Sequence, residues 1–558
     1  MPYHDGLILI LSFVAKGSAF MIRGVSLQSL VVVGIISVTL VATGCRKAKV
    51  APSPAGGTAA PTTNKVAAEV EDQLKSGLYQ LQPENLGIDS RVEDAVSVLN
   101  NWWSAVKSAN LEPTGLTPPA IPETLLTAPA REELNRELFG NMDGLHIRNA
   151  YLAKQIGDHV TAKADKEIDR VSAMFNWVCR NMELIPEDET SPPLPFYELL
   201  MMGRGRTFDR AVVFAELLRQ FRIDTVILHP QGALEADTPW IIGVLLDGQV
   251  YLFDARLGFP IPRGDAPPTA ANPSVATLEE VLKNPGWLTA LAMRSDQPYE
   301  PSVEQLQTAQ VSVLPSVMAW SPRMWRIEQL LPGDRLCVLY DPPAKIGDAP
   351  SLFERVEAAF PEQAAKKQVQ LYADPFLTNP PDQTEQQAIG RSIQTAQATL
   401  AVPFVSNKES GTPGGSPLVP SHRQRKTRMT QLQGRYAEAI AQYVSIRQLG
   451  TSLPPEPGLG PIYARAAEDA FYWSCLCKVD AGQYDSAATS LGDYITRYRR
   501  GGRWLAGARQ ALADCQIARQ QYPEAIETLK QTVADDPARA STAVQIKRLS
   551  GLTIERDK

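Results

Sequence analysis

Three short segments of the chain hold residue types that could build a catalytic site. Residues 205–207 (Gly-Arg-Thr) precede an apolar run at 211–220. Residues 238–240 (Thr-Pro-Trp) precede a second apolar run, and residues 254–258 (Asp-Ala-Arg-Leu-Gly) follow a third. A nucleophile at a helix start works with a base that activates it and a carboxylate that orients the base. These segments are therefore the first candidates for such a triad.

The elements that would position these segments follow from the spacing of apolar residues. Apolar side chains recur at helical spacing in two runs, and β-rich residues dominate three others. Asp247-Gly248 separates two of the β-rich runs, and Asp-Gly in that position is a strong hairpin signal. The predicted order is helix, helix, strand and hairpin, at residues 163–182, 211–220, 223–228, 240–246 and 249–253.

This order resembles the transglutaminase-like (papain-related) fold over residues 163–260. That family carries Gly-x-Cys at the start of the apolar helix, His-x-Trp on one strand and Asp-x-x-x-Gly on the next. The chain matches the glycine, tryptophan and aspartate positions of these motifs at Gly205, Trp240, Asp254 and Gly258. The resemblance places Thr207 in the cysteine position and Thr238 in the histidine position.

Two threonines in these positions imply that the family's chemistry is lost. A catalytic cysteine acts as a thiolate, which a helix N-terminus and a protonated histidine stabilise. Thr207 has no thiol and Thr238 has no group that titrates near neutral pH, so Asp254 has no base to orient. Removing the nucleophile or the base of a triad lowers kcat by about 10⁶. The resemblance therefore implies a pseudoenzyme without catalytic residues. The remaining cleft would be lined by Gly205, Trp240 and Gly258.

Two other functions stay open at this point. A displaced nucleophile would make the chain a cysteine-type hydrolase or transferase, that is, a protease, an amidase or a transglutaminase. Cys179 and His229 are the candidates, and a small core residue and an edge histidine are the plainer interpretations. Alternatively, the silent cleft would be a cell-wall-binding module with Trp240 as its apolar wall.

Basic residues gather in three places. Arg204, Arg206 and Arg210 surround the start of the second apolar helix, where they could hold an anion or simply form surface charge. Residues 422–428 and 497–504 are rich in arginine, and such runs bind acidic partners or, more often, form solvated loops and helix ends.

The C-terminal part, residues 426–558, repeats a six-residue pattern that begins at residues 434, 482 and 520. The pattern resembles the tetratricopeptide repeat, in which a tyrosine packs between helices and an alanine permits their close approach. The packing residues would be Tyr436, Ala439, Tyr484, Ala487, Tyr522 and Ala525. Such stacks form concave surfaces, so the resemblance implies protein or peptide partners bound through this region.

The N-terminus resembles the leader of a bacterial lipoprotein. Met21 is a candidate start, followed by a cationic residue and an uncharged run that ends in Thr-Gly-Cys45. Lipidation of Cys45 would anchor the chain in a membrane, and residues 51–63, rich in Pro, Gly, Ala and Thr, would act as a tether. An uncleaved membrane-spanning segment is the alternative. Both interpretations predict a cell-envelope protein that faces the periplasm or the exterior.

Length and composition limit the remaining classes. The 558 residues are enough for about three or four domains. Lys and Arg number 55 against 61 Asp and Glu, a net charge of −6, which argues against nucleic acid as a partner. Six cysteines are too few for a disulfide scaffold, and no motif indicates a metal or another cofactor.

The sequence as a whole predicts an α+β fold, with a transglutaminase-like central domain followed by an all-α helical-repeat region. The predicted function is that of a membrane-anchored scaffold for protein interactions. The expected segments are a signal peptide with a lipobox (1–45), a flexible tether (46–66), a helical N-terminal segment (67–140), the transglutaminase-like domain (141–330), a small mixed α/β segment (331–404), a linker (405–425) and the repeats (426–558).

Overall fold

The computed structural model describes residues 61–556, apart from 114–116, 186–193, 233, 235–237, 265–273, 293–297, 332–336, 373–382, 407–417, 451, 453–455 and 533–535. The predicted signal peptide, Cys45 and residues 46–60 of the tether lie outside the described residues. The remaining tether residues, 61–66, were predicted to be flexible but belong to the helix Pro61–Gln80. Residues 72–558 form one compact unit. The predicted α+β class is confirmed.

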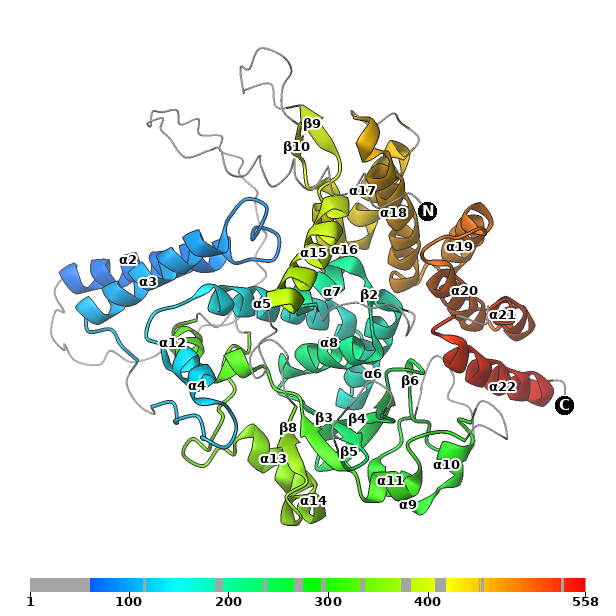
Figure 1. Cartoon of the computed structure of the whole chain (residues 1–558), viewed down its shortest axis with the longest axis horizontal. Helices are drawn as coiled ribbons and strands as arrows, with labels where there is room; N and C mark the ends of the chain where they lie inside the picture. Colours follow the sequence, from blue (N-terminus) through cyan, green and yellow to red (C-terminus); the bar gives the residue numbers. More distant parts are fainter. Residues whose placement is uncertain are drawn as a thin grey trace, which may run out of the picture. The chain divides into compact units, whose positions relative to one another are not determined.

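The N-terminal part begins with five consecutive helices, and strands and helices are mixed from residue 183 onward (Figure 1). The helices are α2 (Pro61–Gln80), α3 (Val92–Ser108), α4 (Ala128–Asn135), α5 (Asn141–Thr161), α6 (Glu167–Asn181), α7 (Phe196–Met202), α8 (Thr207–Arg219), α9 (Leu278–Lys283), α10 (Gly286–Thr289), α11 (Val303–Gln307), η1 (Val317–Trp320), α12 (Pro322–Leu330), α13 (Leu352–Ala359) and α14 (Pro361–Ala365). The strands are β1 (Glu183–Leu184), β2 (Arg204–Gly205), β3 (Asp224–His229), β4 (Ile241–Leu246), β5 (Gln249–Asp254), β6 (Phe259–Pro260), β7 (Gln310–Val313) and β8 (Val369–Leu371).

A six-stranded sheet forms the centre, in the order β6-β5-β4-β3-β7-β8. The predicted hairpin is confirmed: β4 and β5 pair antiparallel with Leu246 opposite Gln249. Asp247 and Gly248 both have positive φ angles (52° and 73°), as the tight hairpin turn requires. The register is well specified because one face of each central strand is buried against helices and the other against a second core.

The two faces of the sheet are covered by different helices. On one face, α6 and α8 pack through Phe175 and Phe214, whose rings meet Phe253 of β5. On the other face, α9, α11 and α13 bury apolar side chains against Val226 and Leu252. Successive strand residues point to opposite faces, so Phe253 and Asp254 are on different sides of β5.

The segment that the sequence set apart as a small mixed unit, 331–404, is part of the central fold. Its strand β8 pairs parallel with β7 at the edge of the six-stranded sheet. Val356 and Phe360 of the same segment belong to the core on the α9 face. Residues 337–340 have no regular structure. The predicted boundary at residue 331 therefore does not separate two cores.

The C-terminal part is helical. Its elements are α15 (Gln383–Leu400), β9 (Phe404–Ser406), β10 (Leu418–Pro420), α16 (Arg423–Leu432), α17 (Tyr436–Leu449), η4 (Pro457–Leu459), α18 (Gly460–Asp480), α19 (Tyr484–Tyr498), α20 (Leu505–Ala518), α21 (Tyr522–Leu529) and α22 (Arg539–Arg556). From α16 to α22 each helix packs on the next, coloured from yellow to red in Figure 1. The predicted linker, residues 405–425, overlaps these elements, because β10 and the first residues of α16 lie within it.

The repeated alanines and tyrosines behave differently in this helical stack. Ala439, Ala487 and Ala525 are fully buried, which allows neighbouring helices to approach closely. Tyr484 is 38% exposed, so it does not pack between helices as expected. The aromatic side chains that are buried in this stack lie at other positions of the helices, such as Tyr443. Tyr436 contacts His159 edge-on, and Tyr522 is half-buried against the last core cluster.

Buried charged groups join the helical stack to the central fold. Asp480 of α18 accepts hydrogen bonds from Arg180 (3.1 Å) and Asn181 (3.1 Å) at the end of α6. Arg428 of α16 is fully buried and donates to the Leu200 carbonyl (2.9 Å) while its guanidinium lies over the Trp473 ring. The arginine-rich stretch 422–428 is therefore a packing element, not the solvated helix end that its composition suggested.

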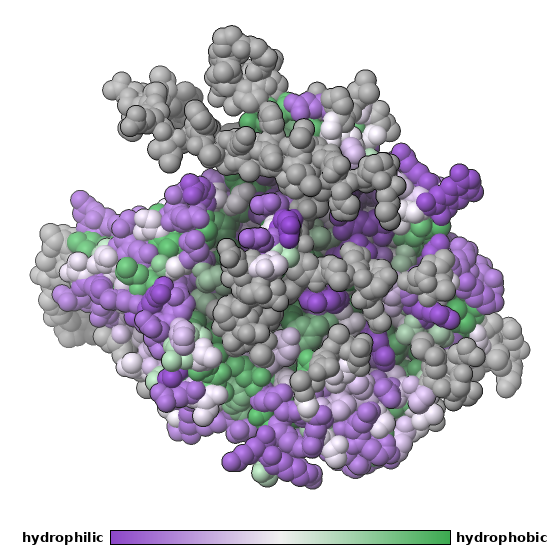
Figure 2. Space-filling view, viewed as in Figure 1, coloured by the Kyte–Doolittle hydropathy of each residue, from purple (hydrophilic) through white to green (hydrophobic). Residues whose placement is uncertain are grey.

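The surface in view is mainly polar over the sheet's lower helices. Figure 2 shows hydrophilic residues over α13, α14 and α9, as expected for a face in contact with water. Within the described residues, none of the helices combines the length and the apolar character needed to cross a bilayer.

Candidate functional site at the start of helix α8

The start of α8 is built from residues 205–209. Thr207 is the first residue of the helix and is half-buried. The Asp209 carboxylate accepts a hydrogen bond from the Arg206 backbone N–H (2.7 Å), which satisfies one of the free donors of the first turn. A Cβ at Gly205 would lie 2.9 Å from the Asp209 Cβ, so only glycine permits this tight entry. Steric crowding thus explains why a glycine occupies this position of the predicted motif.

An aromatic cluster brings the first two predicted segments together. The Phe208 ring, next to Thr207, lies 6.0 Å edge-on from the Trp240 ring and 4.4 Å from the Tyr372 ring, measured between centroids. Thr238 is half-buried and lies two residues before Trp240. The segments that hold the two threonines therefore meet above the α8 face of the sheet.

Asp254 shapes the turn after β5. Its Oδ1 accepts hydrogen bonds from the backbone N–H groups of Arg256 (2.8 Å) and Leu257 (2.9 Å). Its Oδ2 accepts a hydrogen bond from the Tyr299 hydroxyl (2.8 Å). Gly258 closes the turn with a φ of +72° and donates to the Asp254 carbonyl (2.8 Å). The Asp-x-x-x-Gly pattern is thus explained by turn geometry.

The carboxylate of Asp254 points away from the aromatic cluster. Phe253 faces α6 and α8, whereas the hydrogen-bond partner of Asp254, Tyr299, belongs to the core on the opposite face. In the β4–β5 pair Ile242 lies opposite Phe253, so the next position along the strands sets Ile241, not Thr238, opposite Asp254. The structure therefore brings the segments of Thr207 and Thr238 together, while the carboxylate of Asp254 is engaged by its own turn and by Tyr299.

Arg210 is a buried cross-link beside this site. Its guanidinium donates to the carbonyls of Met182 (2.8 Å), Ala255 (3.0 Å) and Cys179 (3.1 Å). The positive charge thereby stabilises the C-terminal end of α6, where carbonyl groups lack helical partners. Arg206 pairs with Asp209 (3.5 Å), and Arg204 lies over the Trp504 ring. Arg204 and Arg210 both act to lower the pKa of the buried Glu183 carboxyl, against the larger effect of burial.

Cys179 does not have the properties of a displaced nucleophile. Burial raises the pKa of its thiol to about 11, although Arg210 acts in the opposite direction. Burial likewise raises the pKa of Cys337, Cys475 and Cys515, each to about 12. A thiol with a raised pKa is protonated near neutral pH, and the thiolate is the reactive form.

A buried serine and histidine pair lies on the α8 face of the sheet and was missed in the sequence. His229 Nδ1 lies 2.8 Å from the Pro230 carbonyl, and Nε2 lies 2.9 Å from Ser312 Oγ. Gln370 Nε2 donates to the same Oγ (3.1 Å). Since a carbonyl only accepts, Nδ1 carries the proton, Nε2 accepts, and the serine hydroxyl donates. Both His229 and Ser312 are about 1% exposed, so this pair satisfies buried polar groups.

The sequence pattern indicated the position of His229 but not that of Ser312. His229 follows Ile227 by two residues on a predicted strand, which places both on one face. Ser312 belongs to β7, which the sequence pattern did not indicate. The other core histidine, His146, is held by the Leu339 carbonyl (3.0 Å) and Ser316 Oγ (3.2 Å).

Metal binding finds no support in the described part of the chain. No group of three or more His, Cys, Asp or Glu side chains there is arranged to hold a metal ion. Thr207, Thr238 and Asp254 do not add a further set of metal ligands.

Comparison with protein families assigns residues 154–231 to the transglutaminase-like superfamily. This stretch contains α6, α8 and β3 with Thr207, and it ends before Thr238 and Asp254. Searches of curated proteins and of solved structures found no match. Residues 154–231 are therefore transglutaminase-like.

Proposed function

We propose that this chain is a membrane-anchored, extracytoplasmic lipoprotein that acts as a scaffold for protein interactions, with a catalytically silent transglutaminase-like domain. The observation that carries the proposal is the state of the triad positions. Thr207 begins α8, and both carboxylate oxygens of Asp254 are engaged by Arg256, Leu257 and Tyr299.

Catalytic silence follows from the chemistry of these groups. A threonine hydroxyl needs an adjacent base to become a nucleophile. Thr238 supplies none, and the carboxylate of Asp254 faces the core on the other side of the sheet. The cysteine-type hydrolase or transferase is not favoured, because burial raises the pKa of the Cys179 thiol to about 11.

The scaffold role is supported by the helical stack and its firm attachment. Consecutive packing of α16 to α22 is the arrangement that forms extended binding surfaces in repeat proteins. Arg428 and the Arg180–Asp480 pair fix the stack to the transglutaminase-like domain. Val444 (48% exposed) and Tyr484 (38% exposed) offer apolar contact points on α17 and α19.

The anchor is proposed from the sequence of residues 21–45 alone. Lipidation of Cys45 and the following Pro/Gly/Ala/Thr tract would place the body of the protein at a membrane surface on a flexible tether.

Turnover assays test catalytic silence. The full chain, a Thr207→Ala variant and a Cys179→Ser variant are assayed for ammonia release and amine incorporation with glutamine-containing peptides. All three are expected to give the rate of the buffer control. Turnover in the unmodified chain that is lost in either variant contradicts the proposal.

Partner capture tests the scaffold role. The full chain is cross-linked in envelope membranes, and captured proteins are compared with those of a Val444→Asp/Tyr484→Asp variant. A matched control, Glu362→Lys, changes an exposed residue of α14. We expect specific partners that the control retains and the double variant loses. Identical capture by all three proteins would remove the basis for a role of this face.

A further inference from the structure

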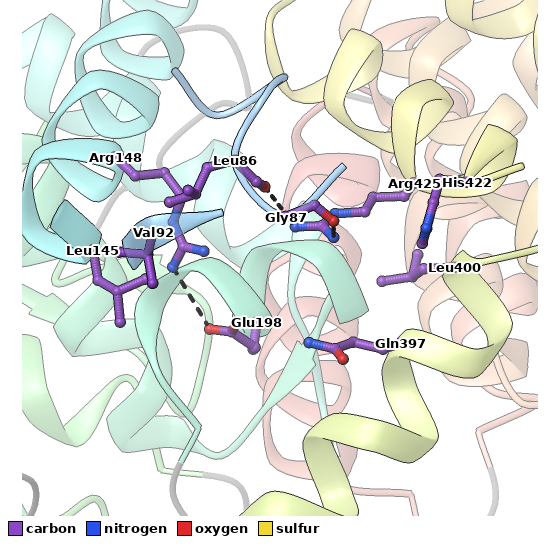
Figure 3. A pocket seen from close by; sticks show the side chains of 10 residues that line it. All are labelled: Leu86, Gly87, Val92, Leu145, Arg148, Glu198, Gln397, Leu400, His422 and Arg425. Carbon is purple, nitrogen blue, oxygen red and sulfur yellow. Dashed lines mark hydrogen bonds and ion pairs between the residues drawn. The ribbon is translucent and has the colours of Figure 1, made fainter. Parts of the chain in front are cut away.

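A cavity of about 360 Å³ lies where the central fold meets the helical stack (Figure 3). Its walls come from the loop after α2, from α5 and α7, and from α15 and the start of α16. Leu86, Leu145 and Leu400 contribute apolar surface. The polar groups are Arg148, Glu198, Gln397, His422 and Arg425. The volume suits a small molecule.

Arg148 is 5% exposed and forms one long ion pair, with Glu198. Its guanidinium stacks 3.9 Å from the centroid of the Tyr197 ring and donates to the side-chain oxygen of Asn149 (3.1 and 3.2 Å). The nearest carboxylate, Glu198, is 4.0 Å away, beyond hydrogen-bonding distance. The charge of Arg148 is therefore only partly compensated.

Arg425 is held entirely by neutral groups. It donates to the carbonyls of Gly87 (2.8 Å) and Leu86 (3.1 Å) and to the Tyr197 hydroxyl (2.9 Å). Among the residues that the structure describes, no carboxylate lies within 4.0 Å of it. A guanidinium has five N–H donors, so two remain for another acceptor. An uncompensated buried charge is costly unless a partner neutralises it.

Glu198 is a negatively charged group that lacks a hydrogen-bond donor for one of its oxygens. Its Oε2 is buried and accepts no hydrogen bond. Figure 3 shows Arg148 directed toward Glu198, with the Gln397 amide turned toward the same space. Burial and the neighbouring Arg425 and Lys426 lower the pKa of His422, so its ring is neutral near pH 7. The formal charge of the lining is then two positive and one negative.

We propose that this cavity binds a small acidic amino compound that carries two acid groups and one ammonium group. The acid groups would accept hydrogen bonds from Arg148 and Arg425, and the ammonium would donate to Glu198. The ligand's net charge of −1 balances the lining's +1. This inference does not depend on the proposed scaffold role, because it uses none of the residues assigned to that role.

Calorimetric titration of the full chain with sodium L-glutamate tests the proposal. Glutarate lacks the ammonium, L-glutamine lacks the second acid group, and inorganic phosphate is a simple anion. We expect glutamate to bind at least tenfold more tightly than any of the other three. Equal binding of glutamate and phosphate, or no heat with glutamate, would overturn the proposal.

Variants locate the site and separate the two charges. Arg148→Met is expected to weaken glutamate binding tenfold or more, whereas Arg435→Met, an exposed arginine before α17, leaves it unchanged. Glu198→Gln is expected to reduce the affinity for glutamate to that for glutarate. If Arg148→Met does not fold, as judged by circular dichroism, Glu198→Gln decides. Unchanged preference for glutamate in Glu198→Gln contradicts the assignment.

Discussion

The start of α8 and the cavity at the junction with the helical stack differ in how completely their polar groups are satisfied. Near α8, Asp254 and Arg210 each make three hydrogen bonds, mostly to the backbone. In the cavity, Glu198 keeps a carboxylate oxygen without a donor, and Arg425 is buried without a counter-charge. Buried polar groups that lack partners are unfavourable unless a ligand supplies them.

The comparison distinguishes residues that match the family motifs from buried groups whose hydrogen bonds or charges are not fully paired. The glycines and the aspartate of the transglutaminase-like motifs are explained by the entry to α8 and by the turn after β5. Retention of such residues therefore says little about turnover. The cavity groups Glu198 and Arg425 belong to α7 and α16, at positions that the family motifs do not mark.

The largest expected effect is at the junction itself. Asp480→Ala removes the carboxylate to which Arg180 and Asn181 donate, and removing one partner of a buried pair costs about 3–5 kcal/mol in the free energy of unfolding. Urea denaturation measures this. Asp480→Asn, which keeps an oxygen acceptor, should lose clearly less. A loss below about 1 kcal/mol for Asp480→Ala would mean that the pair does not join the two regions.

A second prediction concerns Glu183, which burial holds at a pKa of about 8, against an ordinary value of 4.5. The folded chain keeps a proton that the unfolded chain releases, so this carboxyl lowers the stability as the pH rises from about 4.5 to 8. Glutamine does not titrate. Glu183→Gln should therefore gain stability relative to the unmodified chain over this window, by about 1.4 kcal/mol for each pH unit.

Denaturation at pH 5, 7 and 8.5 measures the Glu183 effect. Glu362→Gln, at an exposed position on α14, serves as the control and should show no such trend. A constant difference between Glu183→Gln and the unmodified chain at the three pH values would show that Glu183 is not a buried neutral acid.

The third prediction tests the structural role of Asp254. Asp254→Ala removes the acceptor of two backbone N–H groups and of the Tyr299 hydroxyl, at a cost of about 2 kcal/mol. Asp254→Asn keeps an oxygen for the turn and should retain most of the stability. Thermal unfolding followed by calorimetry distinguishes them. Equal stability of both variants and the unmodified chain would instead favour a role in chemistry.

The smallest effect is expected at the helix start. Thr207→Cys places a thiol at the N-terminus of α8, where the helix dipole favours the thiolate. The change in stability should stay within about 0.5 kcal/mol. We expect the new thiol to react with iodoacetamide without any gain of turnover. Restored turnover would show that a base and an orienting group are already in place.

The central elements were predictable because their signals are local. The apolar helix at 211–220, the strand at 223–228 and the Asp-Gly hairpin all correspond to α8, β3 and the β4–β5 turn. The edge of the sheet was not predictable in full. The place of β8 beside β7 depends on long-range pairing that no local pattern encodes.

The sequence predicted which residues lie near the site but not the directions in which their side chains point. Trp240 and the segment of Thr207 meet, as the resemblance implied. The strand register sends the Asp254 carboxylate to the opposite face, and a one-residue difference in register reverses a side chain. The buried arginines of 422–428 were misjudged because composition does not tell whether a charged helix face meets solvent or carbonyl groups.

Thiol labelling tests the central claim, that the transglutaminase-like domain has no activated nucleophile. In the full chain carrying Cys45→Ser, the remaining cysteines are Cys179, Cys337, Cys475, Cys477 and Cys515. At pH 7.5 we expect no label from iodoacetamide in the folded protein, complete labelling in denaturant, and one fast site in the Thr207→Cys control. Rapid labelling of the folded chain that disappears in Cys179→Ser would contradict the account.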